Sequence, residues 1–118
     1  MINTLLDVDD SEIRCNDGST VKYAWKKSST NSTNWIVFLG GGGGCWDQKS
    51  CRKRWDENWP MQHHWMSSKN YLSSIDVFGL FSPDKEESPL WDANKAIINY
   101  CSSDYFFGNL KGKKLWNY

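Results

Sequence analysis

Three stretches of the chain carry the patterns of β-strands. From Thr20 to Lys27, polar and apolar residues alternate with a period of two, which predicts a strand with one exposed face. Residues Trp35–Leu39 are a continuous run of bulky and branched apolar side chains, which is typical of a central strand covered on both faces. The segment Lys95–Cys101 predicts a second interior strand.

A glycine run and a helix separate the two apolar strands. Gly40–Gly44 follow the first of them directly, and glycine permits positive φ and close approach of the backbone to another group. Residues 48–59 then contain helix formers, with Cys51, Trp55 and Trp59 at four-residue spacing on one face. Strand, loop, helix and strand predict a βαβ unit with parallel strands. The fold class indicated is therefore α/β.

Length and charge narrow the class of protein. At 118 residues the chain can bury one apolar core, and no linker or repeat divides it, so we expect a single domain over residues 1–118. Its 14 basic and 14 acidic side chains cancel, which argues against nucleic acid or an anionic membrane as the partner. No apolar run approaches the roughly 18 residues of a membrane span. The start of the chain also lacks the basic region of a secretory signal, so either the protein is not exported or its true start lies upstream.

The cysteines and a sequon indicate the compartment. Asn31 begins an Asn-Ser-Thr glycosylation sequon in a polar segment that predicts a surface loop. None of the cysteines forms a Cys-x-x-Cys pair, and His63 and His64 are adjacent, so this spacing argues against zinc. We expect no metal and no cofactor. An even cysteine count beside a sequon favours a secretory or extracellular setting. The cysteines are Cys15, Cys45, Cys51 and Cys101.

The eight tryptophans leave two interpretations open. One is amphipathic packing, with each indole half-buried and its N–H near water or a backbone carbonyl. The other is a surface on which a ligand stacks. They are Trp25, Trp35, Trp46, Trp55, Trp59, Trp65, Trp91 and Trp116.

A glycine loop after a central strand has three chemical interpretations. A phosphate-binding loop ends in Gly-Lys-Ser/Thr, whereas here Gln48 precedes Lys49 and Ser50. A dinucleotide fingerprint needs glycines at set positions, which five consecutive glycines match only trivially. An oxyanion hole needs only backbone N–H groups at a strand-to-helix transition, as in α/β-hydrolases. The residues alone leave this third interpretation beside a plain flexible turn.

Four further motifs follow the glycine run in order. They are Cys45–Cys51, Met66–Ser68, Ser88–Asn94 and Tyr100–Asp104. This ordered set resembles the pectin acetylesterase and Notum family of carboxylesterases. In that family a Gly-Gly segment and a Cys-x5-Cys pair precede a Met-Ser-Ser element, an Asn-Pro segment and a strand ending in Tyr-Cys-Ser-Ser-Asp or Tyr-Cys-x-Gly. The likeness extends from Cys15 to Asp104, and the last motif is the most specific.

The resemblance implies the amino-terminal part of an α/β-hydrolase fold, with a mostly parallel and incomplete sheet. It implies the disulfides Cys15–Cys101 and Cys45–Cys51, of which the shorter would pin the glycine loop to its helix. Carried over position by position, the backbone N–H groups of Gly42 and Gly43 would be the oxyanion donors. Family members usually have an aromatic residue here, so the chain departs from the pattern at Gly43 and Gly44.

The resemblance also implies residues at the mouth of the pocket, but it gives no counterpart for the family nucleophile. Asp104 and Tyr105 fall where the family lines this mouth, with Trp46 as a further candidate, although a plain surface loop past the strand is the alternative. The family nucleophile lies in a Gly-x-Ser-x-Gly type elbow, and nothing in residues 102–118 has that form.

No catalytic triad is expected in this chain. Ser102 and Ser103 lack the small flanking residues of an elbow, and neither His63 nor His64 has a visible orienting partner. We therefore expect a truncated product of a secreted serine carboxylesterase, which carries the oxyanion loop but does not catalyse alone.

The resemblance also implies a substrate class and leaves alternatives. An acylated polysaccharide or a lipidated protein would be the substrate, and the sequence does not predict an oligomeric state. Two other functions stay open: a non-catalytic glycan- or lipid-binding module with Trp46 and Trp91 as contacts, and an inactive pseudo-enzyme.

Overall fold

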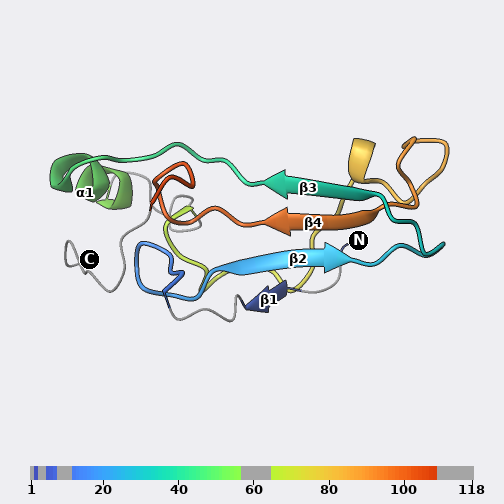
Figure 1. Ribbon diagram of the computed structural model, residues 1–118. Helices are drawn as coiled ribbons and strands as arrows, with labels where there is room; N and C mark the ends of the chain where they lie inside the picture. The colour runs from blue at the N-terminus through green and yellow to red at the C-terminus, as the bar shows by residue number, and fades with distance from the viewer. Residues whose placement is uncertain (1, 3–4, 8–11, 57–64, 109–118) are drawn as a thin grey trace. The chain divides into compact units, whose positions relative to one another are not determined.

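The structure is a computed structural model that describes residues 2, 5–7, 12–56 and 65–108 (Figure 1). The chain forms two compact units, each built from three segments. The sheet unit contains Met1–Asp7, Lys22–Gly40 and Leu72–Asn99. The loop unit contains Val8–Val21, Gly41–Tyr71 and Tyr100–Tyr118. The chain therefore passes from one unit to the other inside the glycine run and again after the last strand.

The sheet unit holds one four-stranded sheet in the order β1-β2-β4-β3 (Figure 1). Its strands are β1 (Leu5–Asp7), β2 (Lys22–Lys26), β3 (Trp35–Leu39) and β4 (Asn94–Ile98). β3 and β4 run parallel, which confirms the parallel pair that the sequence predicts. β2 pairs antiparallel with both β1 and β4, so one of the three pairings in these described strands is parallel. The expectation of a mostly parallel sheet does not hold for this part of the chain.

β4 has its predicted position, but β2 does not show the predicted single exposed face. β4 lies between two neighbours, and its first two residues, Asn94 and Lys95, are buried, as expected of an interior strand. In β2 the buried Ala24 shares a face with Lys22 and Lys26, whereas Tyr23 and Trp25 on the other face are half-buried. The last ladder bond of the sheet region joins the Gly40 N–H to the Ile98 carbonyl at 2.9 Å.

The burial predicted for β3 is wrong. Of its five residues only Ile36 is buried, while the other four, including Trp35 and Val37, are more than half exposed. The reason is that no layer of helices covers the faces of this edge strand in the described residues of its unit. In the described part of its unit the only helix is the single 3-10 turn η2 (Gly79–Phe81), whose Phe81 ring meets Phe38 edge-on at 6.0 Å.

The predicted surface loop before β3 is held by one buried side chain. The Asn94 carboxamide accepts a hydrogen bond from the Ser28 N–H at 3.0 Å and donates to the Ser32 and Asn34 carbonyls at 2.8 and 3.0 Å. Asn31 lies exposed between them with a φ of 59°, a conformation that asparagine tolerates better than most residues. The loop is therefore held by Asn94, while Asn31 of the sequon is exposed to solvent.

The loop unit is held by two disulfides, and both pairings are those that the resemblance implies. Cys15–Cys101 is buried and packs with Val21 as an apolar cluster. Cys45–Cys51 joins the end of the glycine run to helix α1 (Gln48–Asp56). The helix is confirmed over those residues, with Cys51 buried and Trp55 half-buried. Trp59 lies outside the described residues.

Four of the six described tryptophans are half-buried, as the packing interpretation expects. Among the described ones, Trp35 and Trp46 are exposed, at 57% and 81%. The half-buried ones are Trp25, Trp55, Trp65 and Trp91. In the described ranges no helix has the length and apolar character needed to cross a membrane.

Candidate oxyanion loop

The glycine run changes backbone conformation at its centre. Gly42 and Gly43 have φ values of 152° and 75°, both in the range where a side chain is strained. A Cβ on Gly42 would lie 3.0 Å from the Trp65 ring, and one on Gly44 would lie 2.5 Å from the Tyr105 ring. Gly41 has neither constraint. Three of these glycines are therefore required by local geometry, and the plain flexible turn is the weaker interpretation.

The N–H groups at the bend are available to a ligand. No described residue accepts a hydrogen bond from the backbone N–H of Gly42 or of Gly43. Adjacent donors that have no internal partner are what an oxyanion hole or another anion-binding turn requires.

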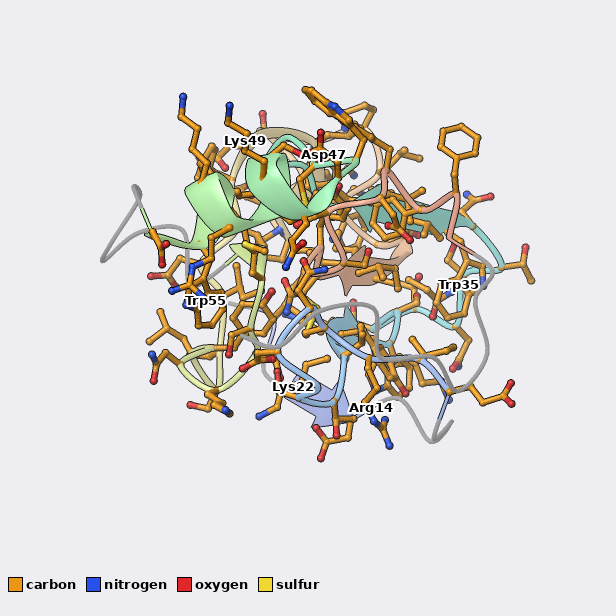
Figure 2. All side chains as sticks on the ribbon, turned by 90° about the vertical axis from the view of Figure 1, so that its left-hand side faces the viewer. Arg14, Lys22, Trp35, Asp47, Lys49 and Trp55 are labelled. Atoms are coloured by element: carbon orange, nitrogen blue, oxygen red, sulfur yellow. A yellow bond between two sulfur atoms is a disulfide. The ribbon has the colours of Figure 1, made fainter. Side chains whose placement is uncertain are left out.

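Helix α1 begins in a capping arrangement that fixes the far end of the loop. The Asp47 carboxylate accepts a hydrogen bond from the Ser50 N–H at 2.6 Å, and the Ser50 hydroxyl oxygen accepts from the N–H groups of Trp46 and Asp47 at 3.1 Å each. The backbone hydrogen bond from Ser50, followed by that from its side chain, lowers the pKa of Asp47 below its ordinary value. Figure 2 shows Asp47 and Lys49 at the start of α1 and Trp55 near its end. The Cys45–Cys51 bridge spans this cap.

A strained loop, residues 102–107, packs against the glycine run. The Cys45 N–H donates to the Ser103 carbonyl at 2.9 Å, which joins the two segments directly. Ser103, Tyr105 and Phe106 all have positive φ, at 57°, 53° and 62°. Three non-glycine residues in this region cost energy that the surrounding hydrogen bonds must offset.

Asp104 supplies those offsetting hydrogen bonds. Its carboxylate accepts from the Ser102 hydroxyl and from the N–H groups of Phe106 and Gly108 at 3.0 and 2.9 Å. The Tyr105 N–H donates to the Tyr100 hydroxyl at 2.9 Å. Burial raises the pKa of Tyr100, although the hydrogen bond from Tyr105 opposes it. Asp104 is thus engaged in holding its own loop.

One buried cation lies at the junction of these segments. Arg54 of α1 is 9% exposed, and its Nε donates to the Ser103 hydroxyl oxygen at 3.0 Å. Its guanidinium carbon lies 5.5 Å from the centre of the Trp65 ring, within cation–π range. Burial lowers the pKa of Arg54, opposed by Tyr100 and Tyr105. Ser103 in turn donates to Asn16 at 2.6 Å.

The predicted site residues are brought together only in part. Gly44 and Tyr105 are in contact range, and Gly42 and Gly43 form the bend between them and Trp65. Trp46 follows the bridge cysteine; its N–H donates to the Ser50 hydroxyl oxygen, and the residue is 81% exposed. His63 and His64 lie outside the described residues. Within the described ranges no group of three metal-ligating side chains gathers.

Two residues of this region were missed by sequence reasoning. Arg54 is one of three consecutive basic residues, and composition alone does not show which of them is buried. Its spacing of three from Cys51 was the available signal, because residues three apart share a helix face. Trp65 offered no signal beyond being one of eight tryptophans.

Comparison with known proteins gives a consistent result. The family model described as Pectinacetylesterase matches residues 1–118. Palmitoleoyl-protein carboxylesterase NOTUM of Drosophila melanogaster is 42% identical over 99 residues, which are 83% of this chain and 14% of that protein. An inactive palmitoleoyl-protein carboxylesterase, notum1b of Danio rerio, is 37% identical over 100 residues, which are 84% of this chain and 68% of that protein.

A solved structure matches the fold as well. The structure of the Wnt deacylase Notum from Drosophila, an α/β-hydrolase, superposes with a TM-score of 0.76 and 39% identity, covering 88% of this chain and 29% of that one. The chain therefore spans less than a third of that structure, and about a seventh of the fly sequence relative.

Proposed function

Because the chain belongs to the pectinacetylesterase family, we propose that it forms the oxyanion-loop part of a serine carboxylester hydrolase. The observation that carries this proposal is the bend at Gly42 and Gly43. Both residues have positive φ, and no described residue accepts a hydrogen bond from either N–H. The loop is held at its far end by the Cys45–Cys51 bridge, so its donors are fixed before any substrate arrives.

The chemistry follows from the charge that develops in ester cleavage. When a serine hydroxyl attacks an ester carbon, the carbonyl oxygen gains negative charge, and two fixed N–H donors stabilise that oxyanion. Residues 1–118 contain no Gly-x-Ser-x-Gly elbow. We therefore expect these 118 residues to have no esterase activity alone.

The substrate class comes from the relatives and from exposed residues near the loop. Relatives are named palmitoleoyl-protein carboxylesterases, and the family name refers to pectin acetyl groups. An acylated protein or polysaccharide is thus the substrate that we propose. Trp46, Asp104 and Tyr105 would border the entrance, with the last 59% exposed. Two disulfides and the exposed sequon at Asn31 support an extracellular or secretory location and glycosylation there.

For the fold, we propose one partial α/β-hydrolase domain over residues 1–118. The parallel β3–β4 pair and the exposed apolar side chains of the edge strand β3 support a sheet that continues beyond β3. Such a continuation would pair the free backbone edge of β3, and the crossover helices of a parallel sheet would cover the side chains on its two faces.

A second function has one specific observation in its favour. The chain covers 68% of the Danio rerio protein named inactive, against 14% of the Drosophila relative. A non-catalytic protein that keeps the acyl- or glycan-binding surface would show the same fold and loop. Activity alone separates the two proposals.

A chimera supplies the deciding assay. The matching region of the Drosophila relative is replaced by this chain, and hydrolysis of p-nitrophenyl octanoate is measured per folded protein. We expect turnover above a denatured control. Gly42→Ala should lower kcat about 100-fold, because alanine is strained at a φ of 152° and its Cβ would lie 3.0 Å from Trp65. Gly41→Ala, which meets no atom within 4 Å, is the matched control and should retain activity.

The 118-residue chain is assayed in parallel, with its free thiols counted. We expect no turnover and no free thiol, since all four cysteines are paired. Turnover by this chain alone would contradict the absence of a nucleophile. An inactive but folded chimera would favour the non-catalytic function, and equal kcat for the Gly42→Ala and Gly41→Ala chimeras would contradict the assigned oxyanion donors.

A further inference from the structure

Arg54 is buried on a helix whose other basic residues are exposed. Its side chain is 9% exposed, whereas Arg52 and Lys53 face solvent, and Arg52 pairs with Asp56 at 2.6 Å on the surface. A buried arginine costs desolvation energy, so the surrounding groups must compensate for it. Helix propensity does not explain why Arg54 is buried, so the reason must lie in its contacts.

The partners of Arg54 lie on both sides of the glycine bend. Its Nη1 lies 3.2 Å from the point where a Cβ on Gly43 would stand, and the Trp65 ring that it faces lies 3.0 Å from the corresponding point on Gly42. The guanidinium and the indole thus occupy the space that side chains at these two positions would need. Any rearrangement of Arg54 or Trp65 removes the surface against which the bend packs.

The same side chain also holds the other end of the loop. Arg54 Nε donates to the Ser103 hydroxyl at 3.0 Å, and the Ser103 carbonyl accepts from the Cys45 N–H at 2.9 Å. One guanidinium therefore connects the central bend with the segment that anchors Cys45. A lysine ammonium is a point charge without this planar fork, so it reproduces the charge but not the geometry.

The charge of Arg54 persists at the site. A guanidinium remains protonated in folded proteins, even where burial lowers its pKa. Its contacts with the Ser103 hydroxyl and the Trp65 indole are with neutral groups. A cation held in a partly buried position exerts a stronger field on a nearby negative charge than one in water.

We infer that Arg54 is a positioning residue of the oxyanion loop, which keeps Gly42 and Gly43 in their positive-φ conformation and adds a fixed positive field beside their N–H groups. The inference rests on the proposed function for its catalytic part. Its structural part, the coupling of Arg54 to the two glycines, is testable without any activity.

The first experiment uses the 118-residue chain labelled with 15N-glycine. In Arg54→Gln we expect the amide resonances of Gly42 and Gly43 to shift, while Gly79 of the sheet unit stays unchanged. Arg52→Gln is the matched control, because it removes an exposed arginine two residues away on the same helix. Unchanged Gly42 and Gly43 resonances in Arg54→Gln would overturn the inference.

The second experiment uses the active chimera. We expect Arg54→Gln to lower kcat at least tenfold with KM within twofold, and Arg54→Lys to recover part of the loss because it keeps the charge. Arg52→Gln should keep the parent kcat. A purely structural arginine would instead lower the folded fraction, measured by thermal unfolding and thiol count, without changing kcat per folded molecule.

The outcomes separate the two hypotheses. A folded parent chimera without activity defeats the proposed function, and the glycine resonances then still decide whether Arg54 positions the loop. An active parent with equal kcat in Arg54→Gln and Arg52→Gln overturns the inference while leaving the proposed function standing.

Discussion

Single polar side chains fasten the loops of this protein. Asn94 anchors the segment before β3 through three hydrogen bonds, and the buried Lys95 donates to the Ser82 and Trp91 carbonyls at 3.3 and 2.7 Å. Asp17 does the same in the loop unit, where its side chain is 6% exposed. Among the described residues few large apolar side chains are fully buried, so these hydrogen bonds contribute to holding the loops in place.

Asp17 predicts a pH-dependent stability. Its carboxylate accepts from the Ser19 N–H at 3.0 Å and pairs with Lys69 at 3.3 Å. Burial raises the pKa of Asp17, but hydrogen bonds from Ser19, Ser67 and Lys69 outweigh it and lower the pKa below its ordinary value. The stabilisation is therefore present above the unfolded pKa of about 3.9 and is lost as pH falls through the folded pKa.

The variant Asp17→Asn tests whether the ionised Asp17 carboxylate stabilises the fold. It should lower the free energy of unfolding at pH 7 by about 1 to 2 kcal/mol. The difference from the parent should shrink below about pH 4, where the parent also protonates. Urea unfolding at both pH values measures it. Asp76→Asn, at an exposed position, should change neither value, and a loss from Asp17→Asn that is equal at pH 7 and pH 3 would contradict the charge-based explanation.

At the residue scale, the sequence allowed the disulfide pairings to be predicted but not the burial of charged side chains. The two disulfides were implied by the resemblance, because motif order carries pairing information that spacing alone lacks. The burial of Arg54 and Lys95 was not predicted. Both are charged side chains at positions where only the three-dimensional arrangement supplies their hydrogen-bond partners.

At the scale of elements, periodicity identified β2, β3, β4 and α1, but it missed β1 and did not predict the surroundings of β3. The continuous apolar run of β3 predicted a strand covered on both faces, yet in the described residues this strand is an exposed edge. The residues of a strand indicate the environment in which it is stable, but the segments that supply this environment are distant in the sequence. For the same reason the antiparallel pairing of β2 with β4 could not be read from either segment alone.

We expect the cap of helix α1 to make a measurable contribution to stability. The Ser50 hydroxyl accepts from the Trp46 and Asp47 N–H groups, so Ser50→Ala leaves both without that acceptor and should cost about 1 kcal/mol of stability. Lys49→Ala is the control, because Figure 2 shows this side chain pointing away from the helix and it is exposed. Urea unfolding followed by circular dichroism measures both. A loss from Lys49→Ala as large as that from Ser50→Ala would contradict the cap.

At the scale of the whole molecule, the resemblance predicted the likeness to the Notum structure, whereas residue patterns did not indicate that the chain forms two compact units. Gly42 and Gly43, the positions assigned to the oxyanion loop, have positive φ, and their role stays a prediction. The chain passes from the sheet unit to the loop unit inside this same glycine run, which the run of glycines does not indicate by itself.

The long disulfide makes the last prediction, which concerns the entire chain. Cys15 and Cys101 are 86 residues apart, and their bridge encloses β2, β3 and β4 in one covalent loop. Closing a loop of this length removes more entropy from the unfolded chain than closing the six-residue separation of Cys45 and Cys51. The chain-entropy estimate is about 4 to 5 kcal/mol for the long bridge against about 2 to 3 for the short one.

Two double variants compare the bridges. Cys15→Ala/Cys101→Ala should destabilise the chain more than Cys45→Ala/Cys51→Ala, by about 2 kcal/mol in urea unfolding without reductant. The long bridge is also buried beside Val21, so its removal leaves a cavity that adds to the loss. The short bridge instead spans the helix cap, so its removal should move the Gly42 and Gly43 amide resonances while costing less stability. A larger loss from the short bridge would mean that the cap, and not the covalent loop, holds the molecule together.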